Sequence, residues 1–320
     1  MKILITGATG FIGRHVCERL SGHSIRVAVR DAFAVDRLPK GVDHFEVGSI
    51  GPETNWSRAL HGVDAVVHLA ARAHVLNETA ADPLAEFRKV NRQGTVTLAK
   101  AAKAAGVKRF VFMSSIGVNG NGQGPDYSGA GYRGTDDPQP HDLYAISKRE
   151  AEDELARIEG LEIVNIRPPL VYGPAVPGNM RSLLGIVWKG VPLPLASAKN
   201  RRSFVGVRNL ADFVAVCTES PAAAGKTLTV ADPEVISTPE LLTILGRGLE
   251  KPAKLLPFPV GLASFAAKVA RKQKAFDSLF GSLVVDSSQA YEVLGWKAPH
   301  ALGAGMLEMA QHYRTERMKD

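Results

Sequence analysis

The sequence predicts an α/β protein with a doubly wound parallel sheet and a smaller, mostly helical C-terminal lobe. In the first half, short apolar runs alternate with segments of helical periodicity. The apolar runs span residues 3–5, 25–29, 44–47, 65–69, 110–113 and 163–166, and the helical segments span 12–20, 83–105 and 143–158. This alternation is typical of repeated βαβ units, which form a Rossmann sheet that binds ligands at the carboxyl ends of its strands.

A glycine-rich turn, GATGFIG, lies between the first apolar run and the first helix. At that position, backbone amides and a helix N-terminus can face the pyrophosphate of a dinucleotide. Gly7 would permit the tight turn, Gly10 would let the backbone approach the ligand, and Gly13 would let the helix pack closely. We therefore expect Gly7, Gly10, Phe11, Ile12 and Gly13 to bind a nicotinamide dinucleotide.

The end of the second run indicates which dinucleotide fits. An acid there accepts hydrogen bonds from a ribose 2'-hydroxyl, whereas an arginine pairs with a 2'-phosphate. Arg30 occupies this position, so NADP(H) is favoured, and the neighbouring Asp31 keeps NAD(H) possible. The alternative is that Arg30 is an exposed strand-end residue without a role. Further along the cofactor path, residues Leu69, Ala70 and Ala71 after the fourth run would lead towards the nicotinamide.

Three polar residues follow that would carry out hydride-transfer chemistry. Tyr144 and Lys148 are four apart on a predicted helix and share one face, and Ser115 ends an apolar run. A free tyrosine has a pKa near about 10, which an adjacent ammonium would lower. Ser115 would hold the reacting oxygen while Tyr144 moves its proton. A chance YxxxK match with a half-buried ring and a solvated lysine is the alternative, but the order of the three residues behind the glycine turn argues against it.

Length and composition exclude several classes of protein. With 320 residues, 45% hydrophobic and 22% charged, the chain has the composition of an ordinary globular protein. It has no apolar run of about eighteen residues, and glycines interrupt its apolar start too soon for a signal peptide, so we expect a cytoplasmic protein without an integral membrane segment. Cys17 and Cys217 have no zinc or disulfide spacing, so no metal site is expected.

The net charge of +7 comes from 39 Lys and Arg against 32 Asp and Glu. The basic residues are spread along the chain without interleaved aromatics, which disfavours nucleic acid and fits anionic small ligands. One basic cluster could contact an anionic membrane surface, although the solvated face of an ordinary amphipathic helix is the better explanation. It consists of Lys268, Arg271, Lys272 and Lys274, with Leu262, Phe265 and Val269 on the other face.

The second half changes in composition after residue 167. Prolines 174, 177, 192 and 194 interrupt any regular period, and helical patterns then recur at 239–248, 260–272, 287–294 and 302–317. The strand-like segments 203–207 and 228–230 predict a return to the first sheet. We expect a dinucleotide-binding domain of residues 1–166 plus about 202–231, and a substrate-binding lobe of residues 167–201 plus 232–320.

The motifs together resemble the extended short-chain dehydrogenase/reductase family, and within it the nucleotide-sugar epimerases, dehydratases and 4-ketoreductases. The likeness runs over nearly the whole chain. It rests on TGATGFIG, HLAA at 68–71, Asn91, GVKRFVFMSS, YAISK, RPPLVYGP at 167–174 and RRSFVGVRNLAD at 201–212.

The resemblance implies roles for individual residues. Ser115, Tyr144 and Lys148 match the catalytic serine, tyrosine and lysine, with Tyr144 and Lys148 also at the cofactor and Lys148 bonding the nicotinamide ribose. Arg202 matches an arginine that contacts the nucleotide diphosphate, and Asn179 and Ser115 are further substrate contacts.

The resemblance also implies a homodimer through helices 83–105 and 143–158. Both segments carry apolar residues beyond those that one core face needs. These residues are Val96, Leu98 and Ala102 on the first and Ile146, Ala151 and Leu155 on the second.

Two departures from the family pattern narrow the function. Many members have VYG where this chain has Val118-Asn119-Gly120, and epimerases usually have an acid at the position of Arg30. Ile116 and Gly117 replace the acidic pair of a 4,6-dehydratase. The resemblance therefore implies an NADP-dependent reductase of the C4 keto group of a nucleotide-linked sugar, of the UDP-4-keto-6-deoxy-N-acetylhexosamine type, for surface polysaccharide synthesis. The alternatives are an NAD-dependent UDP-hexose 4-epimerase and a dinucleotide-sensing regulatory protein.

Overall fold

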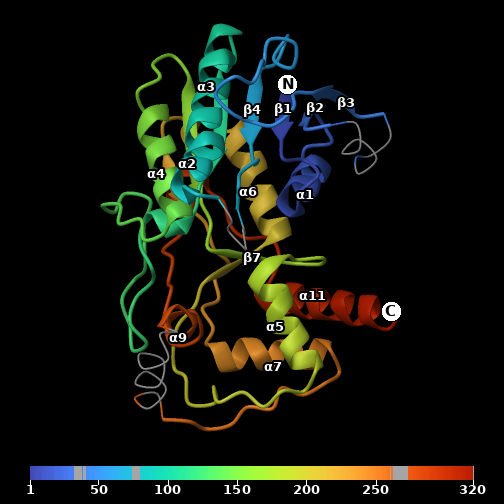
Figure 1. Cartoon of the computed structure of the whole chain (residues 1–320), viewed down its shortest axis with the longest axis vertical. Helices are drawn as coiled ribbons and strands as arrows, with labels where there is room; N and C mark the ends of the chain where they lie inside the picture. Colours follow the sequence, from blue (N-terminus) through green and yellow to red (C-terminus); the bar gives the residue numbers. More distant parts are fainter. Residues whose placement is uncertain (32–37, 39–40, 74–79, 260, 262–272, 320) are drawn as a thin grey trace.

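Figure 1 shows a computed structural model of the chain, which describes residues 1–31, 38, 41–73, 80–259, 261 and 273–319. Within this part of the chain, seven parallel strands form one sheet in the order β3-β2-β1-β4-β5-β6-β9. The strands are β1 (Lys2–Thr6), β2 (Ser24–Val29), β3 (Asp43–Glu46), β4 (Ala65–His68), β5 (Arg109–Met113), β6 (Glu162–Arg167) and β9 (Thr227–Thr229). The strand order reverses between β1 and β4, which is where ligands bind in doubly wound folds. The predicted fold class is confirmed.

Helices cover both faces of the sheet and make up most of the second half of the chain. They are α1 (Phe11–Arg19), α2 (Pro83–Phe87), α3 (Thr95–Ala104), α4 (Leu143–Leu155), α5 (Gly178–Trp188), α6 (Val207–Glu219), α7 (Thr238–Gly248), α9 (Gln273–Phe280), α10 (Ser288–Leu294) and α11 (Leu302–Arg317). A π-helical segment, η2 (Arg88–Gly94), joins α2 to α3, and two 3-10 turns are η3 (Ile116–Val118) and η4 (Pro221–Ala223). Asp82 and Asp142 cap α2 and α4 by accepting hydrogen bonds from backbone amides, which sets where these helices begin.

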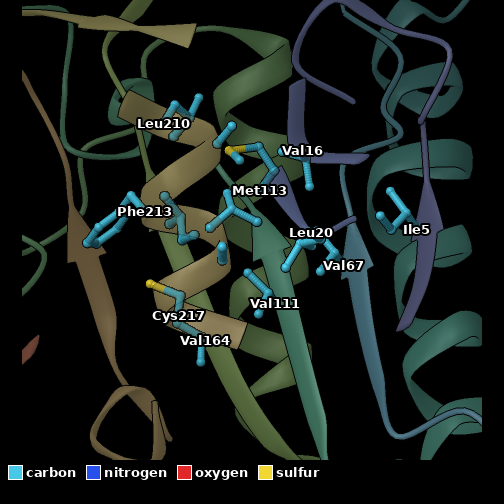
Figure 2. Packing of buried hydrophobic residues seen from close by; sticks show 14 of the residues in the cluster. Ile5, Val16, Leu20, Val67, Val111, Met113, Val164, Leu210, Phe213 and Cys217 are labelled. Atoms are coloured by element: carbon cyan, nitrogen blue, oxygen red, sulfur yellow. The ribbon is translucent and has the colours of Figure 1, made fainter. Parts of the chain in front are cut away.

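The alternating direction of strand side chains builds two separate cores. Ile3 and Ile5 point to the face covered by α1 and α6, and Leu4 points to the face covered by α3 and α4. Figure 2 shows the first of these cores, where Val16 of α1 and Phe213 of α6 pack over the sheet. The sheet is thus buried on both sides, as all-parallel sheets generally are.

The return to the main sheet, predicted from segments 203–207 and 228–230, is made by only one of them. β9 pairs with β6, but β8 (Phe204–Gly206) pairs with β7 (Leu170–Tyr172) in a separate two-stranded sheet. Pro168 and Pro169 precede β7, and because proline has no N–H they end the ladder of β6. The strand expected at 203–207 is thus present as β8, but its expected place in the main sheet was wrong.

The second half has a core of its own, built from α5, α7 and α11. In Figure 1 these helices gather at one end of the sheet, away from the N-terminus. A reciprocal capping box between Ser237 and Glu240 begins α7, close to the predicted start. Of the predicted helix 260–272 and its basic cluster, only residue 261 and Lys274, in α9, are among the described residues. Among the described helices, none is both long and apolar enough to cross a membrane.

The apolar residues that suggested a dimer face are mostly buried within the chain itself. Helices α3 and α4 pack on the sheet and on each other, which takes up these side chains. The buried residues are Val96, Leu98, Ala102, Ala151 and Leu155, with exposed fractions between 0% and 7%, and Ile146 is half-buried. These helices therefore do not carry the surplus of apolar residues from which we expected a dimer, and that argument was wrong.

Candidate active site

The glycine turn at the end of β1 has no room for side chains. Gly7 has a left-handed backbone, with φ of +73°, and a Cβ on it would lie 2.8 Å from the backbone nitrogen of Ala70. A Cβ on Gly13 would lie 2.1 Å from the carbonyl oxygen of Gly7. Gly10 precedes α1 and offers no side-chain cap, so first-turn amides of α1 remain available to an anion. This close-packed turn fits a dinucleotide pyrophosphate.

The residues expected along the cofactor path lie at neighbouring strand ends. The amide of Leu69 donates to the carbonyl oxygen of Thr6 over 3.2 Å, which holds the end of β4 beside the turn. Leu69, Ala70 and Ala71 are half-buried there. Arg30 directly follows β2 and is exposed. The cofactor roles of these residues stay predictions.

The three residues with catalytic potential come from two elements. Ser115 follows β5, and its Oγ accepts a hydrogen bond from the amide of Gly117 at 3.1 Å. Tyr144 and Lys148 lie one turn apart in α4, as their spacing predicts. The Nζ of Lys148 donates to the carbonyl oxygen of Met113 at 2.7 Å. This bond ties the catalytic face of α4 to the strand end that carries Ser115.

Burial dominates the electrostatics of this site. Lys148 is only 1% exposed, and burial lowers its pKa from 10.5 to about 7, with a smaller opposing effect of Glu152. Burial raises the pKa of Tyr144, and the nearby Asp142 carboxylate raises it further. From the sequence we expected Lys148 to lower the pKa of Tyr144. The pKa of Tyr144 is raised instead, so that expectation was wrong. The ammonium is bonded to Met113 and lies 5.8 Å from the centre of the Tyr144 ring.

A buried ion pair lies beside this part of the sheet. Glu152 accepts a hydrogen bond from Nε of Arg167 at 3.0 Å, and Nη1 of Arg167 donates to Oδ1 of Asn119 over the same distance. Asn119 also donates to the carbonyl oxygen of Arg133 at 2.6 Å. Asn119, one of the residues that depart from the family pattern, thus secures the loop between Ser115 and Tyr144.

Sequence reasoning missed a histidine beside the serine. A Cβ on Gly117 would lie 3.4 Å from Oγ of Ser115 and 3.6 Å from Cε1 of His141. The imidazole therefore borders the space over Ser115, and the glycine keeps that space open. The only signal in the sequence was the position of His141, three residues before Tyr144.

The predicted substrate residues lie in the second half of the chain. Asn179 is exposed in the first turn of α5. The backbone of Arg202 bridges to Ile236 and Leu283, its Nη1 donates to the carbonyl oxygen of Gly281 at 3.1 Å, and burial lowers its pKa. Their substrate contacts stay predictions. Among the described residues, no group of three or more His, Cys, Asp or Glu is placed to hold a metal ion.

A doubly wound sheet, a glycine turn at its switch point and a serine, tyrosine and lysine at the neighbouring strand define an NAD(P)-dependent oxidoreductase of the short-chain dehydrogenase/reductase type. The chain belongs to the NAD dependent epimerase/dehydratase family, whose model matches residues 3–231. The resemblance seen in the motifs is thereby confirmed.

Relatives match along nearly the whole chain. A UDP-glucose 4-epimerase of Vibrio cholerae is 42% identical over 98% of this chain and 95% of its own length. An N-acetyl-alpha-D-glucosaminyl-diphospho-ditrans,octacis-undecaprenol 4-epimerase of Escherichia coli O157:H7 is 26% identical over 100% of this chain and 97% of its own. Among solved structures, the UDP-glucose 4-epimerase of Thermus thermophilus in complex with NAD has a TM-score of 0.76 and 26% identity, with 98% of this chain and 99% of that chain covered.

Proposed function

We propose that this chain transfers hydride at C4 of a nucleotide-linked sugar. One observation carries the proposal: Lys148 ties the helix that bears Tyr144 to the end of β5, next to Ser115. In the sheet, only β4 lies between β5 and β1, the strand that the glycine turn follows. A bound nicotinamide supplies or accepts the hydride. The oxidoreductase class follows from the family, and the sugar substrate is supported by the relatives at 42% and 26% identity.

The side chains suit proton transfer at one oxygen. Tyr144 would donate its proton to the alkoxide that develops at C4, and the burial that raises its pKa keeps it protonated before the reaction. The Ser115 hydroxyl would orient the same oxygen. Lys148 would bind the ribose of the cofactor, as the resemblance implies, and its bond to Met113 holds the amine at the end of β5.

Two candidate reactions share this machinery. NADP-dependent reduction of a UDP-4-keto-6-deoxy-N-acetylhexosamine is favoured by Arg30, which lies exposed directly after β2 where a 2'-phosphate would need a cation. NAD-dependent UDP-hexose 4-epimerisation is favoured by the relative from Vibrio cholerae, which matches 98% of this chain. A dinucleotide sensor without catalysis is disfavoured because all three catalytic side chains are present.

One pair of assays separates the candidates. In the first, the purified chain is incubated with the UDP-4-keto sugar and either NADPH or NADH, and the absorbance of the reduced nicotinamide is followed. In the second, it is incubated with UDP-glucose and NAD, and the formation of UDP-galactose is followed. Consumption of NADPH supports the reductase, and UDP-galactose supports the epimerase. Failure of both reactions, with intact cofactor binding, would support the sensor.

The lobes, the assembly and the location complete the proposal. Residues 1–166 with about 202–231 would bind the cofactor, and residues 167–201 with 232–320 would bind the nucleotide sugar in the cytoplasm.

A homodimer would use the outer faces of α3 and α4. Because the apolar residues of these helices are buried, we expect the contact to be polar and sensitive to salt, with ion pairs such as Arg88 with Glu150 near it. A monomer mass by light scattering at micromolar concentration would contradict the dimer.

A further inference from the structure

A fully buried histidine lies between the glycine turn and the catalytic helix. His68, at the end of β4, is 0% exposed. Its Nδ1 lies 2.7 Å from Oγ1 of Thr6, and its Nε2 lies 2.9 Å from Oγ1 of Thr95. Thr6 is the last residue of β1, and Thr95 is the first of α3. One side chain therefore joins two strand ends to the helix beside α4.

The partners of Thr6, His68 and Thr95 fix the direction of each hydrogen bond that joins these three residues. Thr95 Oγ1 donates its only proton to the carbonyl oxygen of Asn91 at 2.7 Å, so it must accept from His68 Nε2. His68 then carries its proton on Nε2 and accepts at Nδ1 from the hydroxyl of Thr6. Thr6 Oγ1 in turn accepts from the amide of Ala70 at 3.2 Å. Only one arrangement of protons satisfies all of these polar atoms, so the hydrogen-bonded residues Thr6, His68, Thr95 and Asn91 form a rigid link.

One end of this link lies under the proposed cofactor turn. Gly7 follows Thr6 and packs directly on the backbone of Leu69 and Ala70. The amides of both residues are held by Thr6, through its carbonyl oxygen and its hydroxyl. The position of the turn and the position of Leu69 and Ala70 are consequently set together.

The other end reaches the backbone of the catalytic tyrosine. Asn91 accepts from the amide of Arg72 at 2.8 Å and donates to the carbonyl oxygen of the same residue at 3.0 Å. Asn91 Nδ2 also donates to Oγ of Ser147 at 3.0 Å, and Ser147 donates to the carbonyl oxygen of Tyr144 at 2.7 Å. Asn91 lies in η2, where π-helical bonding interrupts the α-helical ladder.

The surroundings keep His68 neutral. Its ring stacks on Phe112 with centroids 6.0 Å apart, and the Lys148 ammonium lies 4.4 Å from the centre of that phenyl ring. Burial and the Lys148 charge lower the pKa of His68 to about 3. The hydrogen-bond directions therefore persist at neutral pH.

We propose that His68 is a positioning residue that couples the cofactor turn to the helix bearing Tyr144, through Thr6 on one side and through Thr95, Asn91 and Ser147 on the other. The proposal deepens the hydride-transfer function and rests on it. Hydride and proton must reach adjacent atoms of one carbonyl group, so the donor ring and the tyrosine must keep a fixed separation. A misplacement of about 1 Å can cost on the order of 100-fold in rate.

The test uses Thr95→Val, which removes one hydroxyl from the middle of the link without changing side-chain volume much. Thr218→Val is a matched control, because Thr218 is also buried in a helix and also donates to the carbonyl oxygen four residues earlier at 2.7 Å. Thr95→Ser restores the hydroxyl. His68→Phe, which keeps the ring packing, is the second variant.

Two readouts are needed, and the first requires neither cofactor nor turnover. Amide hydrogen exchange in the free protein should accelerate about tenfold at Ala70 and Arg72 in Thr95→Val, since each amide depends on an acceptor of the link. It should be unchanged at Asn165 in β6, two strands away from His68. The second readout is kinetic. Thr95→Val should lower kcat by about 10- to 100-fold with an unchanged KM for the sugar, and Thr95→Ser should recover most of the loss.

The outcomes separate the two proposals. Equal effects of Thr95→Val and Thr218→Val, or exchange at Ala70 and Arg72 that stays at the wild-type rate in both Thr95→Val and His68→Phe, would overturn the coupling role. Faster exchange at Ala70 and Arg72 with an unchanged kcat would overturn the role of His68 in positioning Tyr144. If the wild type turns over no nucleotide sugar, the proposed function fails, and exchange alone decides whether His68 couples the two elements.

Discussion

Two cations are assigned to the proposed cofactor site, and the protein surrounds them in opposite ways. Lys148 is 1% exposed, is bonded to the carbonyl oxygen of Met113 and has its pKa lowered by burial to about 7. Arg30 follows the last residue of β2 and is exposed to solvent. Both were identified from the sequence by their position relative to a strand or a helix.

This difference in burial separates a residue that takes part in the reaction from one that selects the cofactor. A buried ammonium has lost most of its hydration, so its charge state responds to the protein and its removal should affect stability as well as reaction. An exposed guanidinium keeps its charge and its hydration, so it can select a ligand by charge while contributing little to the fold. Changes on the buried side should therefore be larger and broader than changes at Arg30.

The largest effect is expected on the buried side, at the neighbour of Lys148. Tyr144→Phe keeps the ring and removes the proton donor, so turnover should fall by about 100- to 10,000-fold while folding and cofactor binding persist. Steady-state kinetics on the substrate that the wild type accepts would measure this. Tyr132→Phe is the control, because Tyr132 is also partly buried with a raised pKa but donates to the carbonyl oxygen of Gly122 in the loop. Near-normal turnover of Tyr144→Phe would refute the mechanism.

The next effect concerns stability against pH at Lys148. Its pKa is about 7 in the folded chain and 10.5 as the reference value, so between these values the unfolded chain binds one proton more. Stability therefore rises with pH across that window, and the burial cost is fully present below pH 7. Relative to Lys148→Met, the wild type should gain no more than about 5 kcal/mol between pH 7 and 10.5.

Urea unfolding at a series of pH values measures that difference. Lys100→Met is the control, because Lys100 is exposed on α3 and its removal should leave the slope unchanged. Parallel stability curves for the wild type and Lys148→Met would show that the lysine is not desolvated as described. The Met variant should also lose turnover and bind the dinucleotide more weakly, since the proposed ribose contact goes with the amine.

The smallest of the three effects is expected at the exposed cation. Arg30→Ala should weaken NADPH binding by about 10- to 100-fold and leave NADH binding nearly unchanged, because only the former carries the 2'-phosphate. Fluorescence titration of both cofactors would measure this, with Arg157→Ala, an exposed arginine after α4, as the control. Equal weakening of both cofactors, or a wild type that prefers NADH, would remove the 2'-phosphate role and favour the NAD-dependent epimerase.

The sequence predicts best what depends on local pattern. Consecutive apolar residues such as Ile3, Leu4 and Ile5 identify strands because a buried parallel strand needs apolar side chains on both faces. The glycine turn is readable for the same reason, since Gly13 has no space for a side chain. The spacing of Tyr144 and Lys148 places both on one helical face in the structure as expected.

Features that depend on tertiary packing escaped prediction. The pairing of β8 with β7 depends on which strand edge is available, and Pro177 and the glycines of α5 obscure the helical period there. Helix α6 was also not predicted, although its residues include no proline or glycine. The direction of the Tyr144 pKa shift depends on burial that spacing does not reveal. His68 belonged to a recognised HLAA motif, but its links to Thr6 and Thr95 join residues that are 62 and 27 positions away.

The π-helical segment η2 also affects how the chain would tolerate a change in length. A π-helix bonds each residue to the fifth along instead of the fourth, so residues 88–94 hold one residue more than α-helical turns would need. Deletion of a single codon here would let the segment return to α-helical bonding, with α2 and α3 still packed on their neighbours. We expect such an in-frame deletion to spare folding and displace Asn91, which would yield a stable but inactive allele.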